Sequence, residues 1–211
     1  MRREAPLDIL HLAAHCRNVP VTFTLELMAR DPELSYSEEF ADLPEWKRYF
    51  SLSRAYMEAS RTLCESMIAG DFSAQYSSSR VILHLMRQGI ELFLKGALCR
   101  AAAKQLPKTH DLAKLYATYS LAYPGPKFFF EMPERFQTSP SMDLFPEISL
   151  EEHATLDQRH RYPSDRKGRS FVTPEVFDPE RVLEEVEKLD AMLHVIEYVE
   201  IRRLDRHDDE P

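Results

Sequence analysis

The chain has 211 residues, of which 44% are apolar, enough for the hydrophobic core of one domain with extensions. Its formal net charge of -8 argues against a protein that coats nucleic acid over its whole surface, although a local basic patch is compatible with it. The three cysteines are an odd number at wide spacing, which argues against a disulfide framework and against a structural zinc site.

Residues 1–43 are interpreted as an N-terminal extension without a catalytic pattern. Residues 7–16 suit a short amphipathic helix, while residues 19–27 alternate in a way that suits a strand, and both interpretations stay open. His11 and His15 lie four residues apart, but no third ligand accompanies them, so we predict no metal site. The chain has no signal-type segment and no apolar run of the ~18 residues that a membrane span needs. We therefore expect a soluble, cytoplasmic protein without membrane contact.

Two long helices joined by a tight link are predicted next. Pro44 suits the first turn of the first helix, and Gly70 suits its end. The second helix is predicted to begin near residue 73 and to end near residue 104. Because the link between the two is so short, they must run antiparallel.

The second helix carries a single polar stripe on an otherwise apolar surface. Steps of four, three, four and four residues place the members of the stripe within roughly 80° of the helix circumference. These members are Arg80, His84, Arg87, Glu91 and Lys95. A helix with so much apolar surface is expected to lie at the centre of the fold. Gly89 and Gly96 fall on the face of Ile82, and they predict the close approach of another helix, since glycine inside a helix is otherwise unfavourable.

Three further elements follow in the chain. Thr109 is the predicted N-cap of a third helix, with Asp111 in its first turn. Residues 124–147 hold five of the fourteen prolines and are predicted to form an irregular insertion on the surface of the bundle. Asp178, followed by proline, predicts the start of the last helix. Residues 206–211 form a charged tail.

Three short motifs occur in a characteristic order: ELFLKGAL (91–98), KTHDLAKL (108–115) and RYPSD (161–165). This order resembles the HEPN domain, the nucleotide-binding helical bundle of higher eukaryotes and prokaryotes. The resemblance implies an all-α, up-and-down four-helix bundle over residues 44–205, commonly a homodimer. Members of that family act as ribonucleases, as toxins paired with nucleotidyltransferase antitoxins, or as non-catalytic RNA- or nucleotide-binding modules.

The catalytic pattern of the family's ribonucleases is an arginine followed by four to six residues and then a histidine. Its only formal match here is Arg202 with His207, at the end of the last helix. A chain end is a poor place to hold an acid–base histidine within hydrogen-bond reach of a ribose. We therefore predict a non-catalytic protein, with a metal-independent ribonuclease of the toxin type as the alternative.

The first group of candidate ligand-binding residues lies on the stripe and at the start of the third helix. Glu91 and Lys95 are oriented favourably for an ion pair. If the stripe lines a groove, Lys95 and Arg87 become phosphate ligands instead. His110 and Asp111 either fix the helix start or contact a nucleotide through an imidazole that titrates near neutrality.

The second group lies between residues 159 and 169, where five arginines and lysines and one histidine occur within eleven residues. This local reversal of charge indicates an anionic partner. Tyr162 could stack on a base while Arg159 and Arg161 bind phosphates; pairing with the acidic last helix is the alternative. We predict that the stripe and this basic segment meet in one hollow. The hollow would bind RNA, a nucleotide or a partner protein without a metal or other cofactor; the resemblance suggests a nucleotidyltransferase as that protein.

Overall fold

The computed structural model describes residues 36–101, 107–137, 156–165, 167–171 and 177–202. The described residues belong to two units. The first contains the short helix α2 (Tyr36–Glu39), and the second begins at Leu43 and contains every other element described below. The interpretations of residues 7–16 and 19–27, the His11–His15 pair and the charged tail lie outside the described residues.

Four helices of eleven or more residues form the framework of the second unit. They are α3 (Glu45–Ile68), α4 (Tyr76–Arg100), α5 (Leu112–Ala122) and α8 (Pro179–Val195), which continues as the π-helical segment η5 (Ile196–Ile201). A single turn of helix, α7 (Leu156–Arg159), precedes the basic segment. Apart from an isolated bridge between Ser164 and Ser170, all regular structure in the described residues is helical, which confirms the predicted all-α class.

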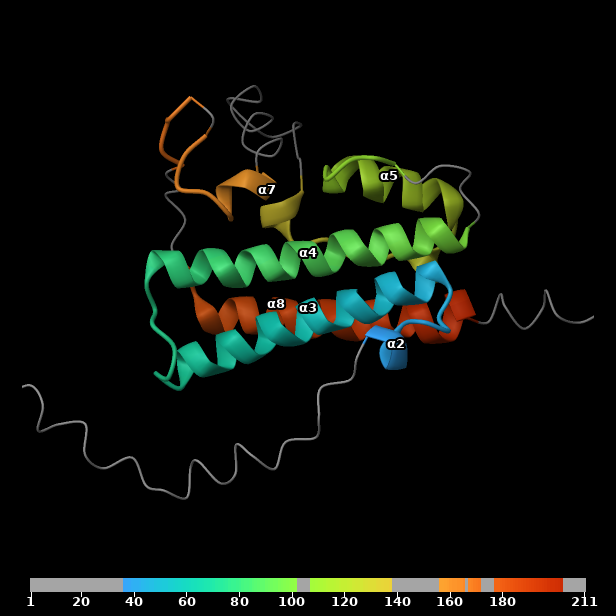
Figure 1. Ribbon diagram of the computed structural model, residues 1–211, viewed down its shortest axis with the longest axis horizontal. Helices are drawn as coiled ribbons and strands as arrows, with labels where there is room; N and C mark the ends of the chain where they lie inside the picture. The colour runs from blue at the N-terminus through green and yellow to red at the C-terminus, as the bar shows by residue number, and fades with distance from the viewer. Residues whose placement is uncertain (1–35, 102–106, 138–155, 166, 172–176, 203–211) are drawn as a thin grey trace, which may run out of the picture. The chain divides into compact units, whose positions relative to one another are not determined.

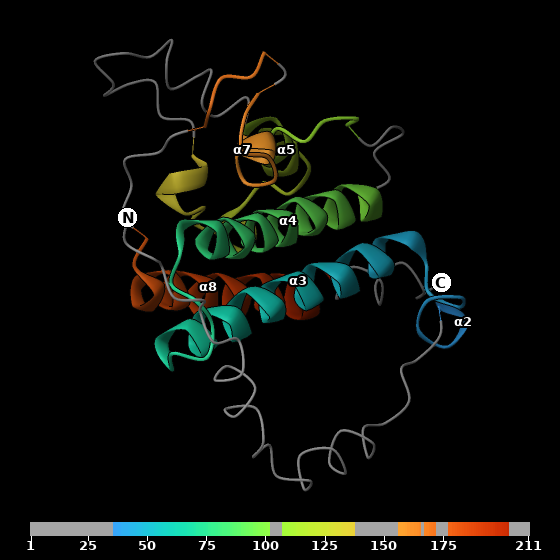
Figure 2. The ribbon, with the colours of Figure 1, turned by 60° about the vertical axis from the view of Figure 1, so that its left-hand side comes forward.

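Helix α4 occupies the middle of this unit, as its apolar circumference predicts. Figures 1 and 2 show α3 and α8 on one side of α4, and α5 and α7 on the other. Most of its residues are buried, including Ile82, Met86, Ile90 and Leu94. Within the described part of the chain, no helix is both long and apolar enough to cross a membrane.

Small residues bring α3 and α4 into close contact. The hydroxyl of Ser53 donates a hydrogen bond to the carbonyl of Gly89 over 2.7 Å. A Cβ placed on Gly89 would lie 2.6 Å from the sulfur of Met57. One placed on Gly96 would lie 3.0 Å both from the ring of Phe50 and from the Cβ of Tyr49. Both glycines therefore serve helix packing, as the sequence predicts.

The starts of α5 and α8 are set by side-chain caps, one of which differs from the prediction. The Asp178 carboxylate accepts a hydrogen bond from the Arg181 amide, and Pro179 occupies the first position of α8, as expected. At α5 the cap is Asp111, whose carboxylate accepts from the Lys114 amide at 3.2 Å. The prediction that Thr109 caps this helix is wrong. Its hydroxyl instead accepts from the amide of Asp111, and so it orients the cap.

The first half of the proline-rich insertion also differs from the prediction, because it contributes to the core. Its two short 3-10 helices, η3 (Pro126–Phe128) and η4 (Glu134–Phe136), flank an extended stretch. Its buried side chains are Phe128, Phe130, Met132 and Phe136. The hydroxyls of Tyr116 and Tyr119 on α5 donate to carbonyls of this stretch over 2.8 and 2.6 Å. Residues 138–147 of the insertion lie outside the described residues.

Substitution of Gly96 tests whether this close helix contact limits side-chain size. Helix propensity alone would make Gly96→Ala more stable by about 1 kcal/mol. The methyl group would lie 3.0 Å from the Phe50 ring and from the Cβ of Tyr49, so these neighbours must shift by a few tenths of an ångström, and overpacking costs about 1–3 kcal/mol. We expect the free energy of unfolding, measured by urea denaturation, to fall by up to about 2 kcal/mol. A rise in stability would contradict this packing.

Candidate functional site

The polar stripe of α4 faces the layer formed by α5 and α7. Three of its members are buried: Arg80 is 9% exposed, Arg87 3% and Glu91 1%. Their partners come from that layer, since Arg80 donates to the carbonyl of Arg159, and Arg87 donates to the carbonyl of His110. The stripe is therefore an internal polar seam over much of its length, rather than an open surface.

Glu91 is the centre of the part of this seam that lies toward the C-terminal end of α4. Its Oε1 accepts from the Lys95 ammonium at 2.7 Å and lies 2.8 Å from Nδ1 of His110, and its Oε2 lies 3.3 Å from the guanidinium of Arg87. Burial alone would raise the pKa of the Glu91 carboxyl. The hydrogen bonds and charges of Lys95 and His110 outweigh burial, and the pKa lies below its ordinary value. Glu91 is therefore a buried carboxylate that joins the side chains of Arg87, Lys95 and His110.

His110 is the solvent-facing member of this cluster. An ionised carboxylate can only accept hydrogen bonds, so Nδ1 of His110 carries the hydrogen that points to Glu91. The side chain is 65% exposed, which leaves Nε2 accessible to solvent and to a ligand. Asp111 follows as the cap of α5 and pairs with Lys114 at 3.2 Å. The predicted residues Arg87, Glu91, Lys95 and His110 thus come together, with Asp111 next to them.

The part of the seam near the N-terminal end of α4 meets the basic segment, residues 159–169. Two groups of the Arg80 guanidinium, Nε and Nη2, donate to the carbonyl of Arg159 over 3.3 and 3.0 Å. The next residue, His160, is 8% exposed, and its ring packs edge-on against Phe136. Burial, followed by the positive charges of Arg80 and Arg87, lowers the pKa of His160 to about 3. His160 is therefore a neutral residue in a cationic surrounding.

Beyond His160 the segment is exposed and closes in a tight turn. Tyr162 is 56% exposed, with the guanidinium of Arg161 lying 5.6 Å from the centre of its ring. Asp165 organises the tip: its carboxylate accepts from the Arg169 amide at 2.9 Å and from the Arg169 guanidinium at 2.6 Å. These contacts hold the pKa of Asp165 below its usual range. Gly168 supplies the left-handed conformation, with φ +77°, that the turn requires.

The two predicted groups therefore lie along the same face of α4. Arg80 and Arg87 are seven residues apart, which is about 10 Å along a helix, and His160 lies within the electrostatic influence of both. The groups differ in accessibility, since Arg87 and Glu91 are buried whereas Arg161, Tyr162 and His110 are exposed.

The sequence analysis did not identify Tyr76 and Phe171, which lie at the N-terminal end of α4. Tyr76 is 53% exposed, and its hydroxyl donates to the carbonyl of Phe171 over 3.2 Å. The guanidinium of Arg80 lies 5.0 Å from the Tyr76 ring, and that of Arg159 lies 5.1 Å from the Phe171 ring. The spacing of four residues between Tyr76 and Arg80 placed them on one helix face and was the available clue.

Arg202 lies apart from this site and has a partner of its own. Its guanidinium donates to Glu197 at 2.7 Å and lies 3.9 Å from the centre of the Tyr198 ring. Glu197 is buried and also binds Arg54 of α3 at 2.7 and 2.8 Å. His207 lies outside the described residues, so the proposed Arg202–His207 pairing stays a prediction. Among the described residues, no three His, Cys, Asp or Glu side chains are placed to hold a metal ion.

The neutral, buried His160 predicts a pH dependence of stability. In the unfolded chain its pKa returns to about 6.5, whereas in the folded chain it lies at about 3. The unfolded state therefore binds the extra proton between these values, and stability falls as the pH drops below about 6.5. The contribution of His160 approaches about 1.4 kcal/mol per pH unit.

Urea denaturation between pH 7 and pH 5 checks this contribution. We expect His160→Phe, which keeps an aromatic ring beside Phe136 but cannot titrate, to lose stability less steeply than the parent. Equal slopes in the two proteins would show that His160 is not held neutral.

Comparisons of the chain with family models, with curated proteins and with solved structures each return no match.

Proposed function

We propose that the chain is a non-catalytic helical module that binds single-stranded RNA. The binding surface is the exposed part of the basic segment, residues 159–169, together with the adjoining N-terminal end of α4. The single observation that carries the proposal is the concentration of arginine–aromatic pairs at this end of α4, within a segment whose charge is opposite to that of the whole chain. The resemblance of the motif order to the HEPN family is consistent with it.

The charge of the segment suits a phosphate backbone. Residues 159–169 contain four arginines, one lysine and one aspartate, a net charge of +4, in a chain of net charge -8. Asp165 binds Arg169 and so neutralises part of this charge. Arg161 and Lys167 are exposed next to the turn. A local basic surface on an acidic protein favours binding of a polyanion there and disfavours coating elsewhere.

The aromatic rings suit unpaired bases. Tyr162 and Tyr76 are each more than half exposed, and each has a guanidinium within 6 Å of its ring centre. Base stacking on exposed aromatic rings, with arginine nearby, is how many proteins hold single-stranded nucleic acid. A duplex would present its phosphates but would keep its bases stacked on one another, so the rings favour a single strand.

The base of the segment is fixed to the helical framework. The hydrogen bonds from Arg80 to Arg159 and from Tyr76 to Phe171 connect the start of the segment, and a residue two positions beyond its end, to the first turns of α4. His160, buried against Phe136, adds an apolar anchor. An exposed loop on a rigid support loses little conformational freedom on binding, which favours affinity.

The proposal predicts weaker RNA binding when Tyr162 is truncated. A fluorescein-labelled oligouridine of about 12 nucleotides is titrated with the full chain at low salt and followed by fluorescence anisotropy. Because one base stack contributes about 1–3 kcal/mol, we expect Tyr162→Ala to weaken binding about 5- to 150-fold. Arg161→Ala should weaken binding and also reduce its salt dependence.

Arg61→Ala is the matched control, since it removes an exposed arginine from α3, where it pairs with Glu65. It should bind as the parent does. Equal affinities for the parent, Tyr162→Ala and Arg161→Ala would disprove the site. Recovery of cleaved oligouridine after incubation would contradict the non-catalytic assignment and favour the ribonuclease alternative.

A further inference from the structure

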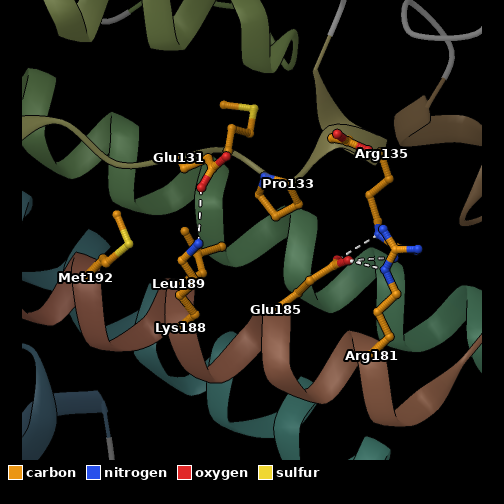
Figure 3. A pocket seen from close by; sticks show the side chains of 10 residues that line it. Glu131, Pro133, Arg135, Arg181, Glu185, Lys188, Leu189 and Met192 are labelled. Carbon is orange, nitrogen blue, oxygen red and sulfur yellow. Dashed lines mark hydrogen bonds and ion pairs between the residues drawn. The ribbon is translucent and has the colours of Figure 1, made fainter.

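The pocket of about 490 Å³ beside α8 carries charges that are paired with one another. Lys188 donates to the carboxylate of Glu131 at 3.1 Å. Arg135 and Arg181 both approach the carboxylate of Glu185, as Figure 3 shows. The lining holds three acidic and three basic residues, so it favours neither an anionic nor a cationic ligand. The cluster around Glu91, at the C-terminal end of α4, is chemically more specific.

The imidazole of His110 is held in one orientation by this cluster. Its Nδ1 donates to Oε1 of Glu91 over 2.8 Å, because an ionised carboxylate can only accept. The carboxylate is fixed in turn by Arg87 and Lys95, one helical turn to either side of it, at 3.3 and 2.7 Å. The guanidinium of Arg87 also donates to the main-chain carbonyl of His110. The histidine is therefore anchored both at its backbone and at Nδ1.

The other ring nitrogen of His110, Nε2, is left accessible. The side chain is 65% exposed, and Nε2 makes no hydrogen bond within the described residues. In a neutral imidazole with its hydrogen on Nδ1, the lone pair lies on Nε2. An oriented histidine whose second nitrogen is bound by a carboxylate is the arrangement that proteins use for nucleophiles and bases. The geometry therefore suits attack by Nε2 on an electrophile from solvent.

Lys95 places a positive charge beside the imidazole. Its Nζ and Nδ1 of His110 both bond to Oε1 of Glu91, so the two nitrogens lie at most 5.5 Å apart, the sum of 2.7 and 2.8 Å. The Lys95 side chain is 17% exposed, and its ammonium makes no second hydrogen bond in the described part of the chain. An ammonium has three donors, so two remain for the oxygens of an anionic group. A phosphoryl group is an anionic electrophile that matches this pair of side chains.

We propose that His110 is a modification site that accepts a phosphoryl group from an acyl phosphate. Nε2 attacks the phosphorus atom, and an N–P bond forms. The bond from phosphorus to the bridging oxygen breaks, and the carboxylate of the donor leaves with its electron pair. The hydrogen on Nδ1 stays in place, so the ring becomes a cation while the phosphoryl group keeps its two negative charges. The new positive charge on the ring balances the negative charge of the released carboxylate.

Both ends of the product have a partner in the cluster. Glu91 stabilises the cationic ring at Nδ1, and the free donors of Lys95 bind the phosphoryl oxygens. An acyl phosphate suits as the donor because its carboxylate leaves without the help of an acid. His110 receives the group stoichiometrically, so the site is compatible with a non-catalytic module. It uses no residue of the proposed RNA surface, and the two proposals stand independently.

Reaction of the full chain with acetyl phosphate tests the site. The reaction is stopped at alkaline pH, where N-phosphoryl histidine is stable. Mass spectrometry of the intact chain follows the gain of a phosphoryl group, tandem mass spectrometry locates it, and phosphorus NMR distinguishes the two ring nitrogens. His194 of α8 is the matched internal reference. It is also exposed, but it stacks on Tyr198 and has no hydrogen bond to a carboxylate within the described residues.

We expect the phosphoryl group on Nε2 of His110, at a rate at least about tenfold above that of His194. His110→Gln should abolish this adduct, and His194→Gln should leave it unchanged. Lys95→Gln should slow its formation at least about fivefold, because the phosphoryl oxygens lose their ammonium partner. RNA binding by His110→Gln should equal that of the parent.

Glu91→Gln separates a positioning role of Glu91 from a purely structural one. Its amide can donate as well as accept, so it no longer determines which nitrogen of His110 carries the hydrogen. We expect the phosphoryl group on both ring nitrogens of this variant, a change of position that loss of stability alone would not produce. Thermal unfolding verifies that Glu91→Gln and Lys95→Gln are folded under the conditions of the reaction.

Four results would overturn the proposal. The first is the absence of a phosphoryl adduct on the parent chain. The second is equal rates at His110 and His194, which would show ordinary solvent exposure. The third is an adduct on Nδ1 of His110 in the parent. The fourth is an unchanged rate in Lys95→Gln together with an unchanged position of the adduct in Glu91→Gln.

Discussion

The buried carboxylate of Glu91 is the constraint on which the arrangement of the two layers depends. An ionised carboxylate that is 1% exposed is very unfavourable unless cations and hydrogen-bond donors surround it. Arg87 and Lys95 of the same helix provide two of these partners, and His110 provides the third from the start of α5. The position of α5 on α4 is therefore set by charge satisfaction as well as by apolar packing.

Helix α4 separates two kinds of contact on its two sides. Toward α3 it offers glycines, which allow Ser53 and Phe50 to approach its backbone closely. Toward α5 and α7 it offers long charged side chains, and these reach the carbonyls of Arg159 and His110. The first side forms a tight apolar contact, and the second fixes the ends of irregular segments. Exposed residues next to those fixed ends are well placed to bind a ligand, because the scaffold already determines their position.

Much of this arrangement could be predicted from the sequence, since it depends on local periodicity. The bounds of α3, the contact at Gly96 and the cap at Asp178 follow from helical spacing and capping chemistry. Contacts distant in the sequence could not be found in this way. His110 lies nineteen residues from Glu91, beyond the end of α4, so no helical spacing connects them. Arg159 meets Arg80 through its carbonyl, which a sequence pattern of charged side chains does not represent.

The extended stretch in the insertion illustrates a different failure of prediction. Its alternating pattern was present in the sequence as Phe128 to Met132, but three consecutive phenylalanines conceal period two, and the prolines around them indicated an irregular surface segment. Only the burial of alternate residues in the structure shows that the segment packs its side chains against the core.

Hydrogen–deuterium exchange of the full chain carrying Glu91→Gln tests the role of the buried carboxylate most directly. The variant keeps the shape of the side chain but removes the charge that Lys95 and His110 share. We predict that amides of α5 exchange at least about tenfold faster than in the parent, because the start of that helix loses its anchor. Amides of α3 and α4 around Gly89 should be much less affected. Unchanged protection of α5 would show that apolar packing alone holds the second layer, and would contradict this account.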